Sequence, residues 1–272
     1  MKPAPIGIMD SGIGGFSVVL EVRKLFPFCP IVYFADPLHF PYGEKRKEEL
    51  APIVQPVVDF LVHGIKVGLL VVACGTVSSL LLPELRERYT LPILGIVEPA
   101  CREALAVVQE GAIGVLATRA TIRVGGFRQA LTRFRPGGEV VEEAWPEFIE
   151  AVEGGVFDTP SWRLWARERL EALHARGVRG VIMGCTHFAL ISTFFEELAR
   201  GLFPIVNPAV SCAQEVGKFL PLGQPQKPGP LTVFVRGDRE GFLRVIERFC
   251  FPLEMDVVSF ENACRWVAHA WG

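Results

Sequence analysis

The sequence has little that would direct the protein to nucleic acid or to a membrane. Its net charge is −2 and it has no dense run of lysine and arginine, so no strong field attracts nucleic acid or anionic lipid. The longest apolar stretch, residues 67–82, is interrupted by polar residues and falls short of the roughly 20 residues that span a bilayer. We therefore expect a small molecule as the partner, with no nucleic acid and no membrane.

Signals for disulfides, metal and export are also missing. The seven cysteines are an odd number without CxxC spacing, which argues against a disulfide framework. Cys185 and His187 have no partner pair at zinc-like spacing, so no metal site is expected. The sequence starts with Met1-Lys-Pro-Ala-Pro5 and has no apolar signal segment there, so we expect reduced thiols in a cytoplasm.

The chain does contain alternating strand-like and helix-like segments. Short β-rich runs are separated by stretches in which apolar residues recur every three or four positions. This alternation predicts an α/β fold, with mostly parallel sheets flanked by helices and ligands at the carboxyl ends of the strands. The expected strands are 6–9, 31–34, 69–73, 93–96, 114–116, 140–142, 181–183, 204–206 and 231–235; the expected helices include 16–26, 47–63, 102–110, 127–133, 160–176 and 241–249; the clearest loop is 222–230.

Two parts of the chain repeat each other. Cys74 and Cys185 each end a short apolar run, and each is followed by a helix-like stretch and a Pro-Ile pair. Upstream, residues 6–11 match residues 113–118, and both segments continue to Gly-Gly-Phe. The repeat predicts two similar lobes related by a pseudo-two-fold axis, with one thiol entering the cleft from each side. We assign residues 1–97 plus 209–272 to the first lobe and residues 98–208 to the second.

The repeated cysteines are candidates for acid and base chemistry. Free cysteines are most often buried small hydrophobes, and that interpretation fits the others: Cys29, Cys101, Cys212, Cys250 and Cys264. Cys74 and Cys185 instead precede Thr-containing turns at strand ends, where helix amides stabilise a thiolate. Two thiols on opposite faces of a carbon suit a reaction that removes a proton from one face and adds one to the other.

The segment from Asp10 to Gly15 follows a strand and opens a helix. It nearly matches a dinucleotide fingerprint, with Asp36 at the end of the next strand. However, Ser17 replaces the third glycine, and Asp10 would place a carboxylate beside a pyrophosphate. Asp10 is better suited to pairing with a proton-transfer group, and capping of the following helix is the alternative.

Three further features have ordinary interpretations when taken alone. His187, two residues after Cys185, could polarise a thiol or serve a structural role. Glu153 precedes a Gly-Gly turn, where an exposed helix-end glutamate is the simplest interpretation. Pro41, Tyr42 and Gly43 form a turn by composition, but they follow the second strand, close to the sheet edge of Asp10.

At these residues the chain resembles the cofactor-independent aspartate/glutamate racemase superfamily, and within it the glutamate racemases. The resemblance implies that Cys74 and Cys185 are the catalytic thiols, with Asp10 beside the first and Glu153 and His187 beside the second. The substrate-binding residues that it implies are Asp10, Ser11, Pro41, Tyr42, Gly43, Gly75, Thr76, Thr118, Thr121, Thr186 and His187. It also implies interconversion of L- and D-glutamate without any cofactor, as a supply of D-glutamate for peptidoglycan, and it leaves a homodimer open.

The chain departs from that pattern at several positions. Gly75 stands where the superfamily has an asparagine, which removes a side-chain amide expected to hold the substrate. Val124 and Phe127 replace a serine and a tyrosine, Trp145 replaces a cysteine, and Ala189 replaces a proline. Two alternatives follow: a racemase of the same superfamily that acts on aspartate or a related acid, and a non-catalytic protein that binds an anionic metabolite or a partner on the same fold.

Overall fold

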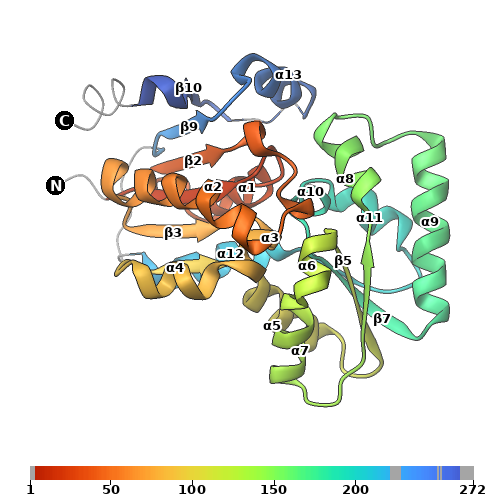
Figure 1. Cartoon of the computed structure of the whole chain (residues 1–272). Helices are drawn as coiled ribbons and strands as arrows, with labels where there is room; N and C mark the ends of the chain where they lie inside the picture. Colours follow the sequence, from red (N-terminus) through yellow and green to blue (C-terminus); the bar gives the residue numbers. More distant parts are fainter. Residues whose placement is uncertain (1–3, 221–227, 250, 252, 264–272) are drawn as a thin grey trace.

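The computed structural model describes residues 4–220, 228–249, 251 and 253–263, and within them the chain forms two α/β lobes (Figure 1). Each lobe is a parallel sheet flanked by helices, as predicted. The first sheet has the order β10-β9-β2-β1-β3-β4 and the second β6-β5-β7-β8. The strands of the first are β1 (Ile6–Asp10), β2 (Ile31–Ala35), β3 (Leu69–Val72), β4 (Ile93–Gly95), β9 (Leu231–Val235) and β10 (Asp256–Ser259); those of the second are β5 (Ala112–Ala117), β6 (Val140–Ala144), β7 (Val178–Met183) and β8 (Ile205–Val206).

The two sheets share one topology. The order β2-β1-β3-β4 in the first lobe corresponds to β6-β5-β7-β8 in the second, with each lobe's first strand in the same place. This correspondence agrees with the internal repeat in the sequence. The strands β9 and β10 extend the first sheet beyond β2, where the second lobe has no counterpart among the described residues. The lobe boundaries at 97/98 and 208/209 stay a prediction.

Most helices lie where the apolar spacing predicts them, with differences at their ends. The first-lobe helices are α1 (Phe16–Leu25), α2 (Lys47–Asp59), α3 (Gly75–Leu80), α4 (Leu82–Arg88), α12 (Pro208–Val216) and α13 (Arg239–Phe249). The others are α5 (Val97–Val107), α6 (Arg119–Val124), α7 (Gly126–Phe134), α8 (Pro146–Glu153), α9 (Pro160–Ala175), α10 (Thr186–Leu190) and α11 (Ser192–Leu198). A few 3-10 turns complete the chain, among them η1 (Pro37–His39) and η2 (Tyr42–Glu44).

Two of the predicted helix boundaries are wrong, and one strand was not predicted, each for a physical reason. The helix expected over 47–63 ends at Asp59 and continues as a π-helix, Phe60–Ile65, closed by Lys66 in the left-handed region. The helix expected from residue 102 begins at Val97, because Pro99 lies in its first turn, where no backbone donor is needed. Strand β10 was not predicted, since it is a half-exposed edge strand with little apolar pattern.

Alternating side chains of the strands build separate cores on the two faces of the first sheet. On β1, Ile6 and Ile8 pack against α1 and α12, whereas Met9 packs on the opposite face against α2. Of the cysteines interpreted as small hydrophobes, Cys101 and Cys212 are buried and Cys29 is half-buried, and Cys250 and Cys264 lie outside the described residues. Most of the loop expected at 222–230 also lies outside them. No helix in the described ranges is both long and apolar enough to cross a membrane.

An aromatic cluster fills the core of the second lobe around Trp145. This side chain is fully buried, and its indole N–H donates to Glu143 Oε2 over 3.2 Å. Four rings surround it, those of Phe148, Trp165, Phe188 and Phe195. Trp145 therefore contributes packing where the superfamily has a cysteine.

We expect Trp145→Ala to lower the free energy of unfolding by about 3–5 kcal/mol, because the deletion leaves a cavity that the surrounding rings fill only in part. Urea unfolding followed by circular dichroism measures the change. Leu164→Ala is the control, because Leu164 lies in the same lobe but is 62% exposed. An equal loss in both variants would show that the aromatic cluster is not a major source of stability.

Candidate functional site

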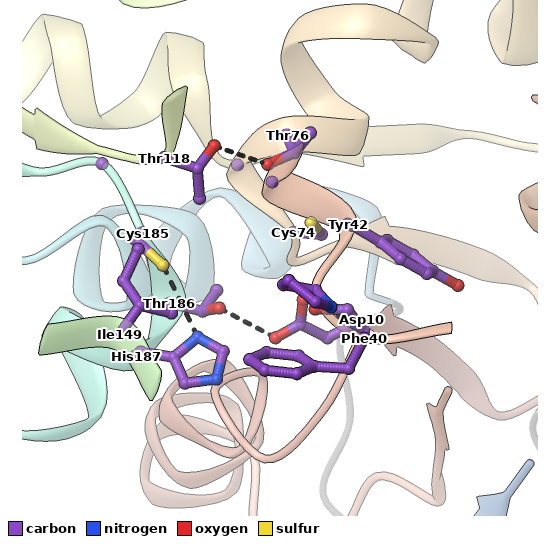
Figure 2. Close-up of a pocket in the computed structure, with 15 residues that line it drawn as sticks. Asp10, Phe40, Tyr42, Cys74, Thr76, Thr118, Ile149, Cys185, Thr186 and His187 are labelled. Atoms are coloured by element: carbon purple, nitrogen blue, oxygen red, sulfur yellow. Dashed lines mark hydrogen bonds between the residues drawn. The ribbon is translucent and has the colours of Figure 1, made fainter. Parts of the chain in front are cut away.

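The carboxyl ends of β1, β3 and β7 meet at a small cavity between the two lobes (Figure 2). Its accessible volume is about 20 Å³, which is room for about one water molecule. It is lined by Asp10, Ser11, Phe40, Pro41, Tyr42, Gly43, Cys74, Gly75, Thr76, Thr118, Ile149, Gly184, Cys185, Thr186 and His187. The sequence therefore predicted most of the lining. Thr121 and Glu153 were also predicted, and they lie behind it, bonded to residues that line it.

Cys74 follows β3 and is the N-cap residue of α3. Burial raises the pKa of its thiol well above the usual value, and the nearby Asp10 carboxylate raises it further. Backbone N–H groups of Val77 and Thr76 donate to the sulfur and act in the opposite direction. Because its pKa is raised, the Cys74 side chain remains a protonated thiol, which is the form that donates a proton.

Cys185 occupies the equivalent position before α10 and lies beside His187. The sulfur is 3.5 Å from His187 Nδ1, and His187 Nε2 is 2.5 Å from Glu153 Oε2. Burial opposes a charge on the imidazole, but the charge and hydrogen bond of Cys185, together with Glu153, raise the pKa of His187 well above its ordinary value. The second side of the cavity therefore has a cationic ring between a sulfur and a carboxylate.

Asp10 lies at the end of β1 and is almost fully buried. Its Oδ1 accepts from the backbone N–H of Ser11 and its Oδ2 from the Thr186 hydroxyl, both at 2.8 Å. Burial raises the pKa of this carboxyl, although the His187 charge and the two hydrogen bonds pull it down. Helix α1 begins after Gly15 with no side-chain cap, so the interpretation of Asp10 as a helix cap is wrong.

Glu153 is the last residue of α8 and turns toward the cleft. Besides bonding to His187, its carboxylate accepts from the backbone N–H of Ile13, in the first lobe, at 3.2 Å. Its side chain is only 19% exposed. The interpretation of Glu153 as an exposed helix-end residue is therefore wrong.

Three hydroxyl groups lie together across the cleft. The oxygen of Thr76, in the first lobe, lies 3.0 Å from that of Thr118, in the second (Figure 2). It also lies 3.2 Å from the oxygen of Thr121, in the second lobe. Thr118 is also the N-cap of α6, where its side chain accepts from the Thr121 N–H. The cluster offers polar groups to a ligand at the side of the cavity opposite His187.

Tyr42 borders the cavity, but its hydroxyl is directed into the first lobe. The hydroxyl points away from the two sulfur atoms and donates to Asp36 Oδ2 at 2.6 Å (Figure 2). Asp36, the acidic residue of the near-match to a dinucleotide fingerprint, is fully buried and bonded inside the protein. A Cβ atom at Gly14 would contact Thr186 and His187 of the second lobe, so that lobe covers the glycine loop. These contacts argue against dinucleotide binding.

Gly75 lies against the backbone of the other lobe. A Cβ atom at this position would be 2.3 Å from the carbonyl oxygen of Gly184, closer than a real Cβ contact allows. The Gly184 carbonyl therefore occupies the space that a side chain at position 75 would need.

The sequence missed three lining residues, Phe40, Ile149 and Gly184. Phe40 packs against the His187 ring with 5.6 Å between ring centroids. In the sequence, only its position directly before Pro41 could have indicated that it lines the cavity. Ile149 is an ordinary apolar residue of α8. The substituted positions Phe127 and Ala189 are both buried in apolar cores, so the lost tyrosine hydroxyl is replaced by packing.

In the part of the chain that the structure describes, no three histidine, cysteine or acidic side chains gather as a metal site. In the group of Cys185, His187 and Glu153, both imidazole nitrogens already have a protein partner.

Comparisons with known proteins all find similarity to racemases. A family model described as Asp/Glu/Hydantoin racemase matches residues 17–216. A glutamate racemase of Geobacter metallireducens is 36% identical over 248 residues, which is 90% of this chain and 92% of that protein. A crystal structure of a glutamate racemase isoform from Bacillus anthracis has a TM-score of 0.87 and 28% identity, covering 96% of this chain and 99% of the other. One from Thermus thermophilus, in complex with β-chloro-D-alanine, has a TM-score of 0.81 and 32% identity, covering 95% and 98%.

We expect Asp10→Asn to stabilise the protein more at neutral than at acidic pH. Because burial raises the folded-state pKa above 3.8, the stability due to the protonated carboxyl is complete below 3.8 and is lost as pH rises through the folded value. Asparagine has no proton to release, so the difference in Tm between variant and wild type should grow from about pH 4 to about pH 7.

Thermal unfolding across this range measures the difference. Asp238→Asn is the control, since the Asp238 side chain is 71% exposed. A Tm difference at position 10 that does not change with pH would contradict a raised pKa for Asp10.

Proposed function

The chain belongs to the Asp/Glu/Hydantoin racemase family, and we propose that it interconverts L- and D-glutamate by proton transfer between two thiols, without a cofactor. The observation that carries the proposal is the pair Cys74 and Cys185, which border one buried cavity from opposite lobes. Each sulfur has its own charged neighbour, Asp10 for the first and His187 for the second.

The proposed reaction has two proton transfers at the α-carbon. One sulfur, as a thiolate, takes the α-proton, and the electron pair of the broken C–H bond remains on the substrate as a carboxylate-conjugated anion. The opposite thiol then gives its proton to the other face of that carbon, which inverts it. Afterwards the first sulfur carries a proton and the second does not, so the reverse reaction uses the same groups with exchanged roles.

The difficult step is removal of a proton that is much less acidic than a thiol. Because the cavity is nearly closed to water, hydrogen-bond donors around it act in a low dielectric and stabilise the developing anion more strongly than water would. The donors near it include the hydroxyl of Thr76 and the backbone N–H groups at the starts of α3 and α10.

The two sides of the cavity differ before any substrate binds. The raised pKa of Cys74 keeps that side protonated, whereas the sulfur of Cys185 lies 3.5 Å from the His187 imidazole. We propose that Cys74 gives a proton to the substrate and that Cys185, beside the imidazole, takes one, with Glu153 orienting the ring through its Nε2 atom.

Glutamate is the substrate that the named relatives favour, since glutamate racemases align over most of the chain. Gly75 favours the alternative, a related acid such as aspartate, because it removes an expected side-chain contact. We further propose a cytoplasmic enzyme that supplies D-glutamate for peptidoglycan.

Activity is expected with neither pyridoxal phosphate nor metal added, and complete loss of activity on treatment with EDTA or hydroxylamine would contradict this.

Cys74→Ala and Cys185→Ala should each abolish racemisation without unfolding the protein, because inversion needs an acid and a base on opposite faces. Cys→Ser at either position should be nearly as damaging, since a hydroxyl is a far weaker acid than a thiol. Circular dichroism of D-glutamate solutions follows racemisation, and α-deuteration in D2O confirms the exchange. Cys212→Ala is the control, because Cys212 is a buried thiol away from the cavity. Wild-type turnover in either active-site variant would refute the two-thiol mechanism.

Gly75→Asn should lower kcat/KM for glutamate by about tenfold to a hundredfold, because the new side chain displaces the Gly184 backbone and with it Cys185. Gly75→Ala should act in the same direction, since the Cβ atom alone makes the clash. Initial rates with L-glutamate, D-glutamate and L-aspartate measure both variants against wild type. An improvement for glutamate in Gly75→Asn would show instead that the lobes make room and that the expected amide contact is simply missing.

A further inference from the structure

Asp36 is a fully buried carboxylate that the proposed chemistry does not use. It follows the end of β2, and its backbone N–H donates to the carbonyl of Asp10 at 3.2 Å. It is therefore fixed directly beside the strand end that carries Asp10, although its own side chain does not line the cavity.

The partners of this carboxylate belong mainly to one segment. His39 Nδ1 lies 3.0 Å from both carboxylate oxygens, and the Tyr42 hydroxyl donates to Oδ2 at 2.6 Å. Both residues belong to residues 37–43, here called the wall segment, which ends in Pro41, Tyr42 and Gly43 at the cavity. Asp36 thus bonds to the wall segment at His39 and at Tyr42, on the side of the segment that faces away from the cavity.

A cation next to the strand end supports the same carboxylate. Arg236 follows β9, and its guanidinium lies 3.7 Å from Asp36 Oδ2 while it donates to the carbonyl of Ile53 on α2. A buried carboxylate is costly unless it is paired and hydrogen-bonded, so its geometry is strongly specified by these partners. The position of the wall segment is therefore fixed by buried electrostatics rather than by apolar packing alone.

We propose that Asp36 is a positioning residue for substrate: through the Tyr42 hydroxyl and His39 it sets where Tyr42 and Gly43 stand against the bound amino acid. This inference rests on the proposed function, since it assumes that the cavity holds the substrate. It assigns the Tyr42 hydroxyl the role of an anchor that fixes the backbone of Tyr42 and Gly43 at the cavity.

Loss of the anchor should weaken substrate binding without removing a proton-transfer group. Interactions made equally with substrate and transition state change KM and leave kcat unaltered. Tyr42→Phe deletes only the hydroxyl that donates to Asp36, and Asp36→Asn keeps the size of the side chain while removing its charge.

The same lobe offers a matched control. The Tyr89 hydroxyl donates to Asp59 Oδ1 at 2.7 Å, and neither residue lines the cavity. Tyr89→Phe and Asp59→Asn therefore remove the same kind of tyrosine–aspartate bond at a distance from the substrate.

We expect Tyr42→Phe to raise KM for glutamate about tenfold with kcat within about threefold of wild type, and Asp36→Asn to raise KM further. The two control variants should keep the KM of wild type, whatever their effect on Tm. Initial rates over a range of L- and D-glutamate concentrations, with thermal unfolding of each variant, make the comparison.

A KM in Tyr42→Phe and Asp36→Asn equal to that of the controls would overturn the inference, and so would a fall in kcat at unchanged KM. Loss of a cooperative unfolding transition in both variants would show that Asp36 serves the fold and not the substrate, and would also overturn it. Absence of α-proton exchange in the wild type would refute the proposed function itself, and this inference with it.

Discussion

The cleft depends on a mutual exchange of hydrogen bonds between the lobes. Asp10 of the first lobe is bonded by Thr186 of the second, and Glu153 of the second by the Ile13 amide of the first. Neither carboxylate could remain in a water-poor interior without such donors, because burial of an unpaired charge is prohibitive. The two carboxylates are consequently held in place only when the two lobes are together.

The fold makes this exchange possible by placing strand ends opposite each other. Parallel sheets collect the carboxyl ends of their strands at one edge, and both lobes use the same strand order, so equivalent edges face the cleft. The repeat gives two equivalent thiols but not equivalent surroundings. Asp10 accompanies Cys74, whereas His187 and Glu153 accompany Cys185, so the two thiols have different charged neighbours.

Sequence patterns predicted most of the architecture and the positions of the two thiols, because strand ends and repeated motifs are local signals, and the resemblance to the racemases named most of the other residues that line the cavity. Sequence patterns could not predict the contacts between the two lobes. Nothing near Glu153 indicates that α8 turns its last residue toward Ile13, and nothing near Gly75 indicates that the Gly184 carbonyl lies against it. The edge strand β10 was not predicted, because half-exposed strands lack a strong apolar pattern. The sequence analysis considered Asp36 only as part of a near-match to a dinucleotide fingerprint, because a carboxylate at a strand end fits a nucleotide site as well as an internal hydrogen-bond acceptor.

The size of the cavity has a consequence for how successive turnovers are linked. At about 20 Å³ it has no room for an amino acid while the lobes are in contact, so the proposed reaction would require the lobes to part. Under the proposed two-thiol mechanism, each inversion would leave the two sulfurs with exchanged protons, ready only for the opposite enantiomer. Parting of the lobes would break the Thr186–Asp10 hydrogen bond and expose both thiols to water, which could then exchange protons with them. The same opening that releases product would therefore let the enzyme act again on the same enantiomer.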